Sequence, residues 1–157
     1  MQKLSKTRSK RGSTLSNWSC VSSTIKPAEN GQLDLLIIEG RLPGLNEYIE
    51  AERGNRIVAA RMKKDYELLI GAYIHIAVSN GTLHRHEKPC ELWITWYEKN
   101  RRRDLDNIAF ATKFIQDSMV KCGVFPDDSQ KYIRLLHHTT HVDNAKPRVE
   151  VIIREVI

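Results

Sequence analysis

The chain has 157 residues, of which 41% are apolar and 28% charged, enough for one ordinary globular domain and unlike a fibrous or wholly disordered protein. Its formal charge is +6, and no apolar run approaches the roughly 18 residues of a membrane-spanning helix, so we expect no membrane partner. Three widely spaced cysteines argue against a disulfide framework, and the basic N-terminus lacks the apolar stretch of a signal peptide. These features predict a cytoplasmic protein.

The positive charge is concentrated at the N-terminus. Residues 1–30 hold six basic side chains and one acidic side chain, a net of +5, which leaves +1 for residues 31–157. This segment is rich in serine and threonine, so it cannot bury enough apolar surface to offset the entropy cost of folding. The sequence predicts a flexible basic tail over residues 1–31 and one domain over residues 32–157. Two interpretations of the tail stay open, a solvated arm and a nucleic-acid contact.

The first half of the domain predicts a strand and a long helix. A short apolar run over residues 33–39, bounded by glycines, predicts a buried strand. A helical pattern follows from Asn46 to about Val78, with an interruption near Gly54 and an end at the Asn-Gly pair that begins at Asn80.

The second half predicts a strand, a helix and two more strands. Residues 90–97 are apolar on both faces, which indicates a central strand. A helix is expected over residues 108–121, and two strands over residues 132–141 and 148–153 flank a hairpin signal at residues 143–147. The order β-α-β-α-β-β predicts an α/β fold, a single domain with a mixed sheet.

Two carboxylates follow the central strand. Asp104 and Asp106 are separated by one residue, so in an extended segment both side chains point to the same side. Folding needs at most one of them, as a helix N-cap. Capping combined with a solvated turn is one interpretation, and a pair of acids that face a common point is the other.

Two further acids, Asp127 and Asp128, follow Pro126 after the second helix. Adjacent acids are common in turns. A strand, one helix and a return loop, however, are able to bring this pair back toward the first. Converging carboxylates raise one another's pKa, and a hard divalent cation such as Mg²⁺ or Mn²⁺ relieves the repulsion. Such an ion lowers the pKa of a bound water and polarises a phosphodiester.

Basic residues surround the first acidic pair. Cations beside carboxylates hold a DNA backbone that the acids alone would repel. Lys113, on the polar side of the following helix, either leans toward the scissile phosphate or pairs with Asp117 four residues later. The residues that directly precede the acids, and that we expect to bind DNA, are Lys99, Arg101, Arg102 and Arg103.

The segment Arg103-Asp104-Leu105-Asp106-Asn107, the helix with Lys113 and the passage from Gly123 into Asp127-Asp128 resemble the RusA family of Holliday junction resolvases. The segment from Gly40 to Asn46 also resembles that family's opening turn, and the similarity covers roughly residues 33–153. The resemblance implies a small homodimeric endonuclease, often from a phage or prophage, that depends on Mg²⁺ or Mn²⁺. It implies a substrate of branched, four-way DNA, cut by two symmetric nicks in recombination and repair, and no small-molecule substrate.

The resemblance also assigns the site. Asp104 and Asp106 match the paired catalytic acids, Asp128 matches the third metal ligand with Asp127 beside it, and Lys113 matches the catalytic lysine. Lys113 lies about one helical turn further from Asp106 than in the family pattern, which an inserted turn near Phe110 would explain.

The sequence leaves one other class of function open. A non-catalytic DNA-binding or junction-binding protein, such as a decayed prophage resolvase, would use the same basic residues. It would have no use for three acids in one place, and its binding would not need Mg²⁺.

A zinc site is a weaker interpretation. His137, His138 and His141 are close in sequence, but His137 and His138 face opposite sides of a strand and no paired-ligand spacing supports a closed site. The aromatic residues of the central strand offer stacking surfaces for bases, yet strand aromatics are more often core residues, and we expect that of Trp93, Trp96 and Tyr97.

Overall fold

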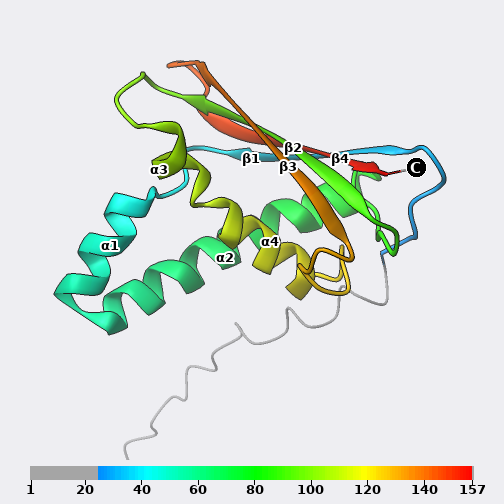
Figure 1. Cartoon of the computed structure of the whole chain (residues 1–157), viewed down its shortest axis with the longest axis horizontal. Helices are drawn as coiled ribbons and strands as arrows, with labels where there is room; N and C mark the ends of the chain where they lie inside the picture. The colour runs from blue at the N-terminus through cyan, green and yellow to red at the C-terminus, as the bar shows by residue number, and fades with distance from the viewer. Residues whose placement is uncertain (1–24, 157) are drawn as a thin grey trace, which may run out of the picture.

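A four-stranded sheet forms one layer of the fold. The computed structural model describes residues 25–156, and its strands are β1 (Leu33–Glu39), β2 (Cys90–Glu98), β3 (Ile133–Val142) and β4 (Arg148–Glu155). The strand order is β1-β4-β2-β3, with β4 antiparallel to both neighbours and β2 parallel to β3 (Figure 1). The predicted α/β class and mixed sheet are confirmed.

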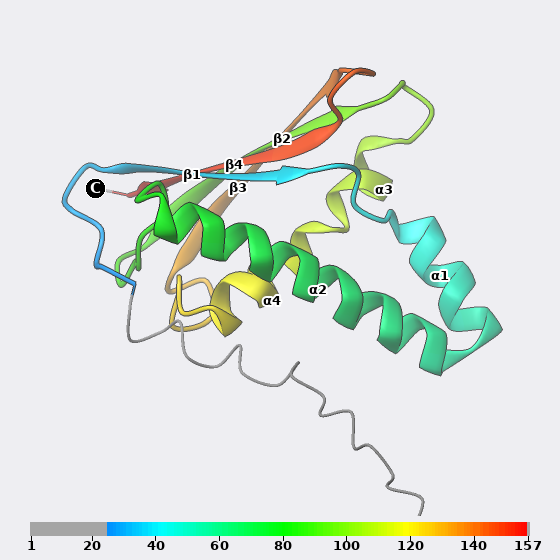
Figure 2. The same cartoon turned by 180° about the vertical axis from the view of Figure 1, so that it is seen from behind.

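The helices lie on one side of this sheet (Figure 2). They are α1 (Leu45–Gly54), α2 (Arg56–Ser79), α3 (Leu105–Ala109) and α4 (Thr112–Lys121). Among the described residues, no helix combines the length and apolar character needed to cross a membrane. We call the helix-covered face of the sheet the inner face and the opposite one the outer face.

The predicted hairpin of the last two strands is wrong. β3 and β4 do not pair with each other, because β2 lies between them. The chain turns after Val142, with the Asp143 N–H donating to the Glu98 carbonyl at 2.8 Å, and so passes the end of β2 before β4 begins. A turn signal identifies the turn but not the strand beside it. Here β4 fills the gap between β1 and β2, where it finds antiparallel partners on both sides.

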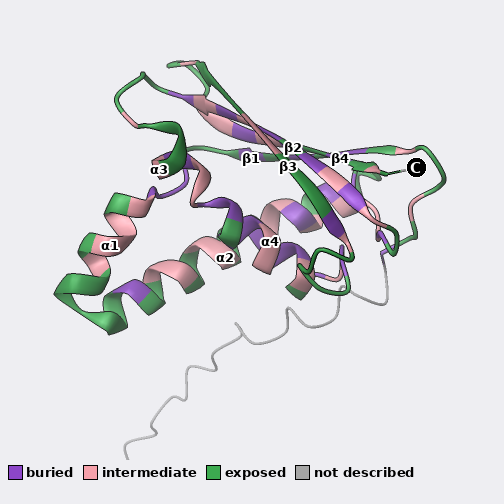
Figure 3. Ribbon diagram, in the orientation of Figure 1, coloured by how far each residue is buried: buried purple, intermediate pink, exposed green. Residues whose placement is uncertain are grey.

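β1 is buried on its inner face only, which corrects the prediction of a buried strand. Leu36 and Ile38 are fully buried, whereas Leu33 on the outer face is 64% exposed. Figure 3 shows how buried, intermediate and exposed residues alternate along the sheet. The same alternation divides the aromatic residues of β2. Trp96 is a core residue as predicted, but Trp93 is 41% exposed because its face of the sheet carries no helix among residues 25–156.

The predicted interruption of the first helical stretch is confirmed. α1 and α2 meet at Asn55, which is extended (φ −164°, ψ 120°) and caps α2 through its side chain, accepting a hydrogen bond from the Ile57 N–H at 2.8 Å.

The second stretch, predicted as one helix over residues 108–121, is instead α3 and α4. Between them the Ala111 N–H donates to the Ile108 carbonyl at 3.3 Å and the Phe114 N–H to the Ala111 carbonyl at 3.0 Å. This three-residue spacing is a 3₁₀ turn. The Phe110 ring at the break packs on Tyr48 of α1, with centroids 5.2 Å apart.

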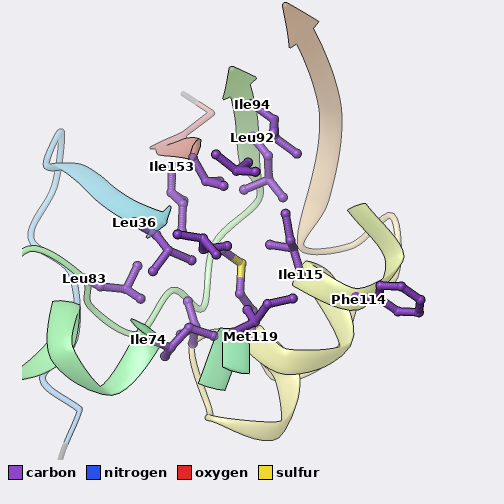
Figure 4. Close-up of a cluster of buried hydrophobic side chains, with 14 of the residues drawn as sticks. Leu36, Ile74, Leu83, Leu92, Ile94, Phe114, Ile115, Met119 and Ile153 are labelled. Atoms are coloured by element: carbon purple, nitrogen blue, oxygen red, sulfur yellow. The ribbon is translucent and has the colours of Figure 1, made fainter. Parts of the chain in front are cut away.

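The core lies between the helices and the inner face. Figure 4 shows Ile74 of α2 and Met119 of α4 among the side chains of Leu36 and Leu92 from the strands. These four side chains are at most 1% exposed, and each stabilises the fold by about 1.5–3 kcal/mol.

Part of the predicted tail belongs to the fold. Ile25 is 7% exposed, and Pro27 bridges to Arg85, where the Ala28 N–H donates to the Arg85 carbonyl at 2.9 Å. The prediction of a flexible segment over residues 1–24 lies outside the described residues.

A buried carboxylate ties β1 to the segment before β2. Asp34 is 1% exposed, and its two oxygens lie 2.9 Å from His84 Nδ1 and His86 Nε2. The His84 backbone N–H also donates to it at 2.6 Å. Burial alone would raise the pKa of Asp34, but these hydrogen bonds outweigh burial and lower that pKa below its usual value.

We expect Asp34→Asn to lower the free energy of unfolding by about 3 kcal/mol near neutral pH, because it leaves the buried His86 and the partly buried His84 without their charged partner. A carboxyl group with a depressed folded-state pKa stabilises the fold above its unfolded pKa of about 3.9, and this contribution disappears as the pH falls through the folded-state pKa. Urea unfolding of both proteins at about pH 7 and about pH 3 tests this. The difference should narrow at the lower pH, and an equal difference at both values would contradict the assignment.

Candidate active site

Asp104 and Asp106 lie at the start of α3. Asp104 is the N-cap residue, with extended backbone (φ −70°, ψ 156°), but its side chain makes no capping hydrogen bond. Asp106 lies in the first helical turn, so the extended geometry expected for both residues holds only for Asp104. Both side chains are exposed and have no hydrogen-bond or ion-pair partner within residues 25–156. Capping therefore does not explain Asp104.

Arg103 fixes the position of this segment. Its guanidinium donates to both carboxylate oxygens of Glu98, from Nε at 3.0 Å and from Nη2 at 2.6 Å, and from Nη1 to the Leu42 carbonyl at 3.0 Å. The Arg103 side chain is only 12% exposed. Arg103 is one of the four residues predicted to bind DNA, and in this structure its charge is paired inside the fold.

Asn107 fixes the other side of the acid pair, a role that our sequence analysis missed. Its Oδ1 accepts a hydrogen bond from the Asn46 N–H at 3.0 Å, which joins α3 to the start of α1. Gly44 lies so close that a Cβ atom there would be 2.5 Å from Asn107 Oδ1 and 3.1 Å from its carbonyl oxygen. The Pro-Gly turn before α1 is the sequence signal that points to this close approach.

The structure brings Lys113 and Asp128 together. Lys113 Nζ lies 2.7 Å from Asp117 and 2.8 Å from Asp128. The predicted alternative, a pair with Asp117, is therefore present together with the contact to the second acidic loop. Hydrogen bonds to Asp117 and then to Asp128 raise the pKa of Lys113, so its ammonium stays charged at neutral pH.

The carboxylate of Asp117 forms ion pairs with two lysines. Lys63 of α2 lies 3.1 Å from its second oxygen, opposite Lys113. Burial tends to raise the pKa of Asp117, but the bonds from Lys113 and Lys63 more than offset this and lower the pKa. Lys113 is thus held by an acid of its own helix and by an acid of the loop after α4, and Asp117 also links α4 to Lys63 of α2.

Asp127 behaves as a turn residue. Its Oδ1 accepts a hydrogen bond from the Ser129 N–H at 2.8 Å. Hydrogen bonds from the Ser129 side chain and then from this N–H lower the pKa of Asp127. Of the two adjacent acids, Asp128 contacts Lys113 and Asp127 stabilises the loop.

Within residues 25–156, no three His, Cys, Asp or Glu side chains are grouped so as to hold a metal ion. The assignment of Asp104, Asp106, Asp127 and Asp128 as metal ligands stays a prediction. The donor chemistry nevertheless fits Mg²⁺, which is commonly bound through one or two carboxylates and completes its shell with waters and substrate phosphates. The exposed, unpaired carboxylates of Asp104 and Asp106 suit this mode.

The remaining basic residues lie in the loop between β2 and α3. Lys99, Arg101 and Arg102 are exposed, and Asn100 shapes the loop by accepting a hydrogen bond from the Arg102 N–H at 3.0 Å. A hollow of about 270 Å³ lies beside this loop; its lining includes Glu98, Asn100, Arg101, Arg103, Ile108 and Thr140. We call it the inner hollow, because Ile108 of α3 and the buried Glu98 place it on the helix side of the strands.

The histidines of β3 pack against β2. The His137 ring stacks on Trp93 with centroids 3.8 Å apart, and His138 Nδ1 accepts a hydrogen bond from Trp96 Nε1 at 3.2 Å. Trp93 is on the outer face and Trp96 on the inner face, so the two histidines face opposite sides, as predicted. The zinc interpretation has no support in this geometry.

Exposed carboxylates are able to hold a divalent cation that acts on a phosphodiester, and the exposed cations of the preceding loop suit contact with a phosphate backbone. A family model described as endodeoxyribonuclease RusA matches residues 45–154 of the chain. The chain belongs to this family and is an endodeoxyribonuclease of the Holliday junction resolvase type. No curated protein matches the sequence.

We expect Gly44→Ala to lower the free energy of unfolding by about 1–3 kcal/mol, because the new methyl group would push Asn107 and the start of α3 away. Gly54→Ala is the matched control, since Gly54 has nothing within 4 Å of its Cβ position and lies in a helix. That control should be neutral or slightly stabilising. Thermal and urea unfolding measure both variants. Equal stabilities of the two would show that the contact between Gly44 and Asn107 is not tight.

Proposed function

We propose that this chain is a Mg²⁺-dependent, structure-selective endonuclease that resolves four-way DNA junctions by paired symmetric nicks. The observation that carries the proposal is the state of Asp104, an N-cap residue whose side chain does not cap. Asp104 and Asp106 are exposed and their carboxylates have no partner among residues 25–156, so neither is explained by a contact within the fold. A role in binding a cation explains why both are present. Mn²⁺ has the same preference for oxygen donors.

Asp104 and Asp106 would hold the ion, and Asp128 supplies the third acid of the proposed catalytic set. The bound ion would lower the pKa of a water and offset negative charge at the phosphodiester. Asp127 is left out of the set because its carboxylate is used in the turn with Ser129.

Lys113 is the proposed electrostatic catalyst. Its side chain is 55% exposed, its ammonium is charged at neutral pH, and Asp117 and Asp128 fix its direction. A positioned cation of this kind stabilises the charge that develops on the phosphate oxygens or on the leaving oxygen.

Lys99, Arg101 and Arg102 are the proposed contacts to the DNA backbone. Arg103 holds the end of their loop in place through its bonds to Glu98 and the Leu42 carbonyl. A homodimer suits the reaction because a four-way junction presents two related strands, and a two-fold axis places one site on each. A cytoplasmic location belongs to the same proposal, in keeping with the buried free thiols of Cys90 and Cys122.

Asp104→Asn should reduce nicking of a synthetic four-way junction at least about 100-fold, because it removes a ligand charge. Junction affinity should change less than about twofold, because the basic surface is intact. Gel assays of nicking in Mg²⁺ and of binding in a chelator measure the two effects. Asp65→Asn, at an exposed acid of α2, is the control and should cut normally.

Cleavage by Asp104→Asn at the wild-type rate would make the metal-site assignment wrong. Wild-type protein that binds junctions but does not cut them in Mg²⁺ or Mn²⁺ would instead favour a non-catalytic junction-binding protein.

The neighbouring acids Asp127 and Asp128 allow a matched comparison. Asp128→Asn should reduce nicking about 100-fold, since it removes an acid of the proposed set and one partner of Lys113. Asp127→Asn should keep nicking within about threefold of wild type, because an asparagine also accepts the hydrogen bond from Ser129. Single-turnover nicking at saturating protein measures both rates. A larger loss of nicking rate for Asp127→Asn than for Asp128→Asn would assign the catalytic role to Asp127 and the turn role to Asp128.

A further inference from the structure

A second hollow lies on the outer face of the sheet, beside the basic loop. It has a volume of about 610 Å³, and three segments line it: the end of β1 with Gly40 and Arg41, Lys99 after β2, and the turn with Lys146 that leads into Arg148 at the start of β4. We call it the outer hollow. Its lining carries four cationic side chains and one carboxylate, Glu39. Neither the family match nor the proposed site accounts for Arg41 after β1 or for Lys146 and Arg148.

The walls of the outer hollow are held rigidly. The Gly40 N–H donates to the Pro147 carbonyl at 2.9 Å, which joins two of the three segments. Asp143 accepts from the Lys146 N–H at 3.0 Å and from Arg148 Nη1 at 2.8 Å, so the turn is closed by its own side chain. Arg148 also lies over the Tyr97 ring, with its guanidinium carbon 3.7 Å from the centroid. The hollow is therefore preformed.

The cations divide into structural and free ones. Arg148 is paired with Asp143 and Glu150, and Arg41 is paired with Glu47. Lys99 and Lys146 are exposed, and their ammonium groups have no hydrogen-bond or ion-pair partner within residues 25–156. Two free ammonium groups at the mouth of a rigid basic hollow are suited to bind phosphate groups without first breaking an ion pair.

We propose that the outer hollow binds the phosphate backbone of one arm of a branched DNA, through Lys99 and Lys146, while the inner hollow receives another arm. This rests on the proposed function and extends its DNA surface to a second face of the sheet. Lys99 lies in the loop that separates the two hollows, so the basic surface continues around the end of β2 from Arg101 to Lys146.

The position of the two hollows selects for DNA shape. Linear duplex is stiff over about 150 base pairs, so it does not bend around the end of a sheet from one face to the other. The arms of a branched DNA already diverge and reach both faces at once. The outer hollow therefore contributes to junction binding and little to duplex binding.

Lys146→Ala tests the proposal, with Lys88→Ala as control. Both lysines are exposed. Lys88 precedes the start of β2, at the end of the strand away from the outer hollow, and it pairs with Glu155. Binding of a labelled four-way junction and of a linear duplex with the same arm sequence is measured by anisotropy in a chelator, over a range of salt concentrations. Lys146→Ala should weaken junction binding about fivefold and reduce its salt slope by about 1, with duplex binding changed less than twofold. Lys146→Glu should give a larger loss in the same direction.

An unchanged salt slope for the junction, or equal losses for junction and duplex, would overturn the proposal. Nicking of the junction by Lys146→Ala at saturating protein should stay at the wild-type rate, and a lost rate there would place Lys146 in catalysis instead. These binding results do not depend on cleavage. Absence of nicking in the wild-type protein would therefore contradict the proposed function. The role of the outer hollow would still be decided by the binding measurements.

Discussion

The ion pair between Glu98 and Arg103 is the interaction on which the geometry of the site depends. Glu98 ends the central strand β2 and is 8% exposed, and Arg103 directly precedes the acid motif, so their paired hydrogen bonds close the basic loop over the strand end. The same guanidinium reaches the Leu42 carbonyl and attaches the loop after β1. Separating such a buried pair leaves an uncompensated charge, at a cost of about 3–5 kcal/mol. Asp104 therefore occupies a defined position although its own side chain makes no bond.

Because of this pair, the three consecutive arginines 101–103 have two different functions. Arg103 is adjacent to the strand end and reaches back to Glu98, whereas Arg101 and Arg102 lie in the exposed loop and keep their charges for an external partner. The near neutrality of residues 31–157 is compatible with DNA binding for the same reason. Many of its acids pair with cations of the fold, as Asp143 does with Arg148, while the side chains of Lys99, Arg101 and Arg102 have no such partner within residues 25–156.

Local pattern predicted the elements well and their pairing poorly. Alternation and helical spacing located every strand and the break at Asn55, because these depend on neighbouring residues. The wrong hairpin, and the unexpected exposure of Trp93, depend on which strand fills a gap and which face the helices cover. In the site, the acids were visible as a motif, but the contact of Asn107 with Asn46 spans 61 residues and has no local pattern. The use of Arg103 inside the fold was hidden in the same way.

The strand order explains why these contacts meet at one place. β1, β2 and β3 run in the same direction, so the segments that leave Glu39, Glu98 and Val142 all begin at one end of the sheet. The antiparallel β4 starts at that end too, and because it lies between β1 and β2, Arg148 is opposite Glu39 on one side and Tyr97 on the other. A hairpin of β3 and β4 at the sheet edge would have left the turn before β4 away from β1. The position of β4 between β1 and β2 therefore forms the outer hollow beside the acid motif. The topology that made the hairpin prediction wrong thus places two basic surfaces around one loop.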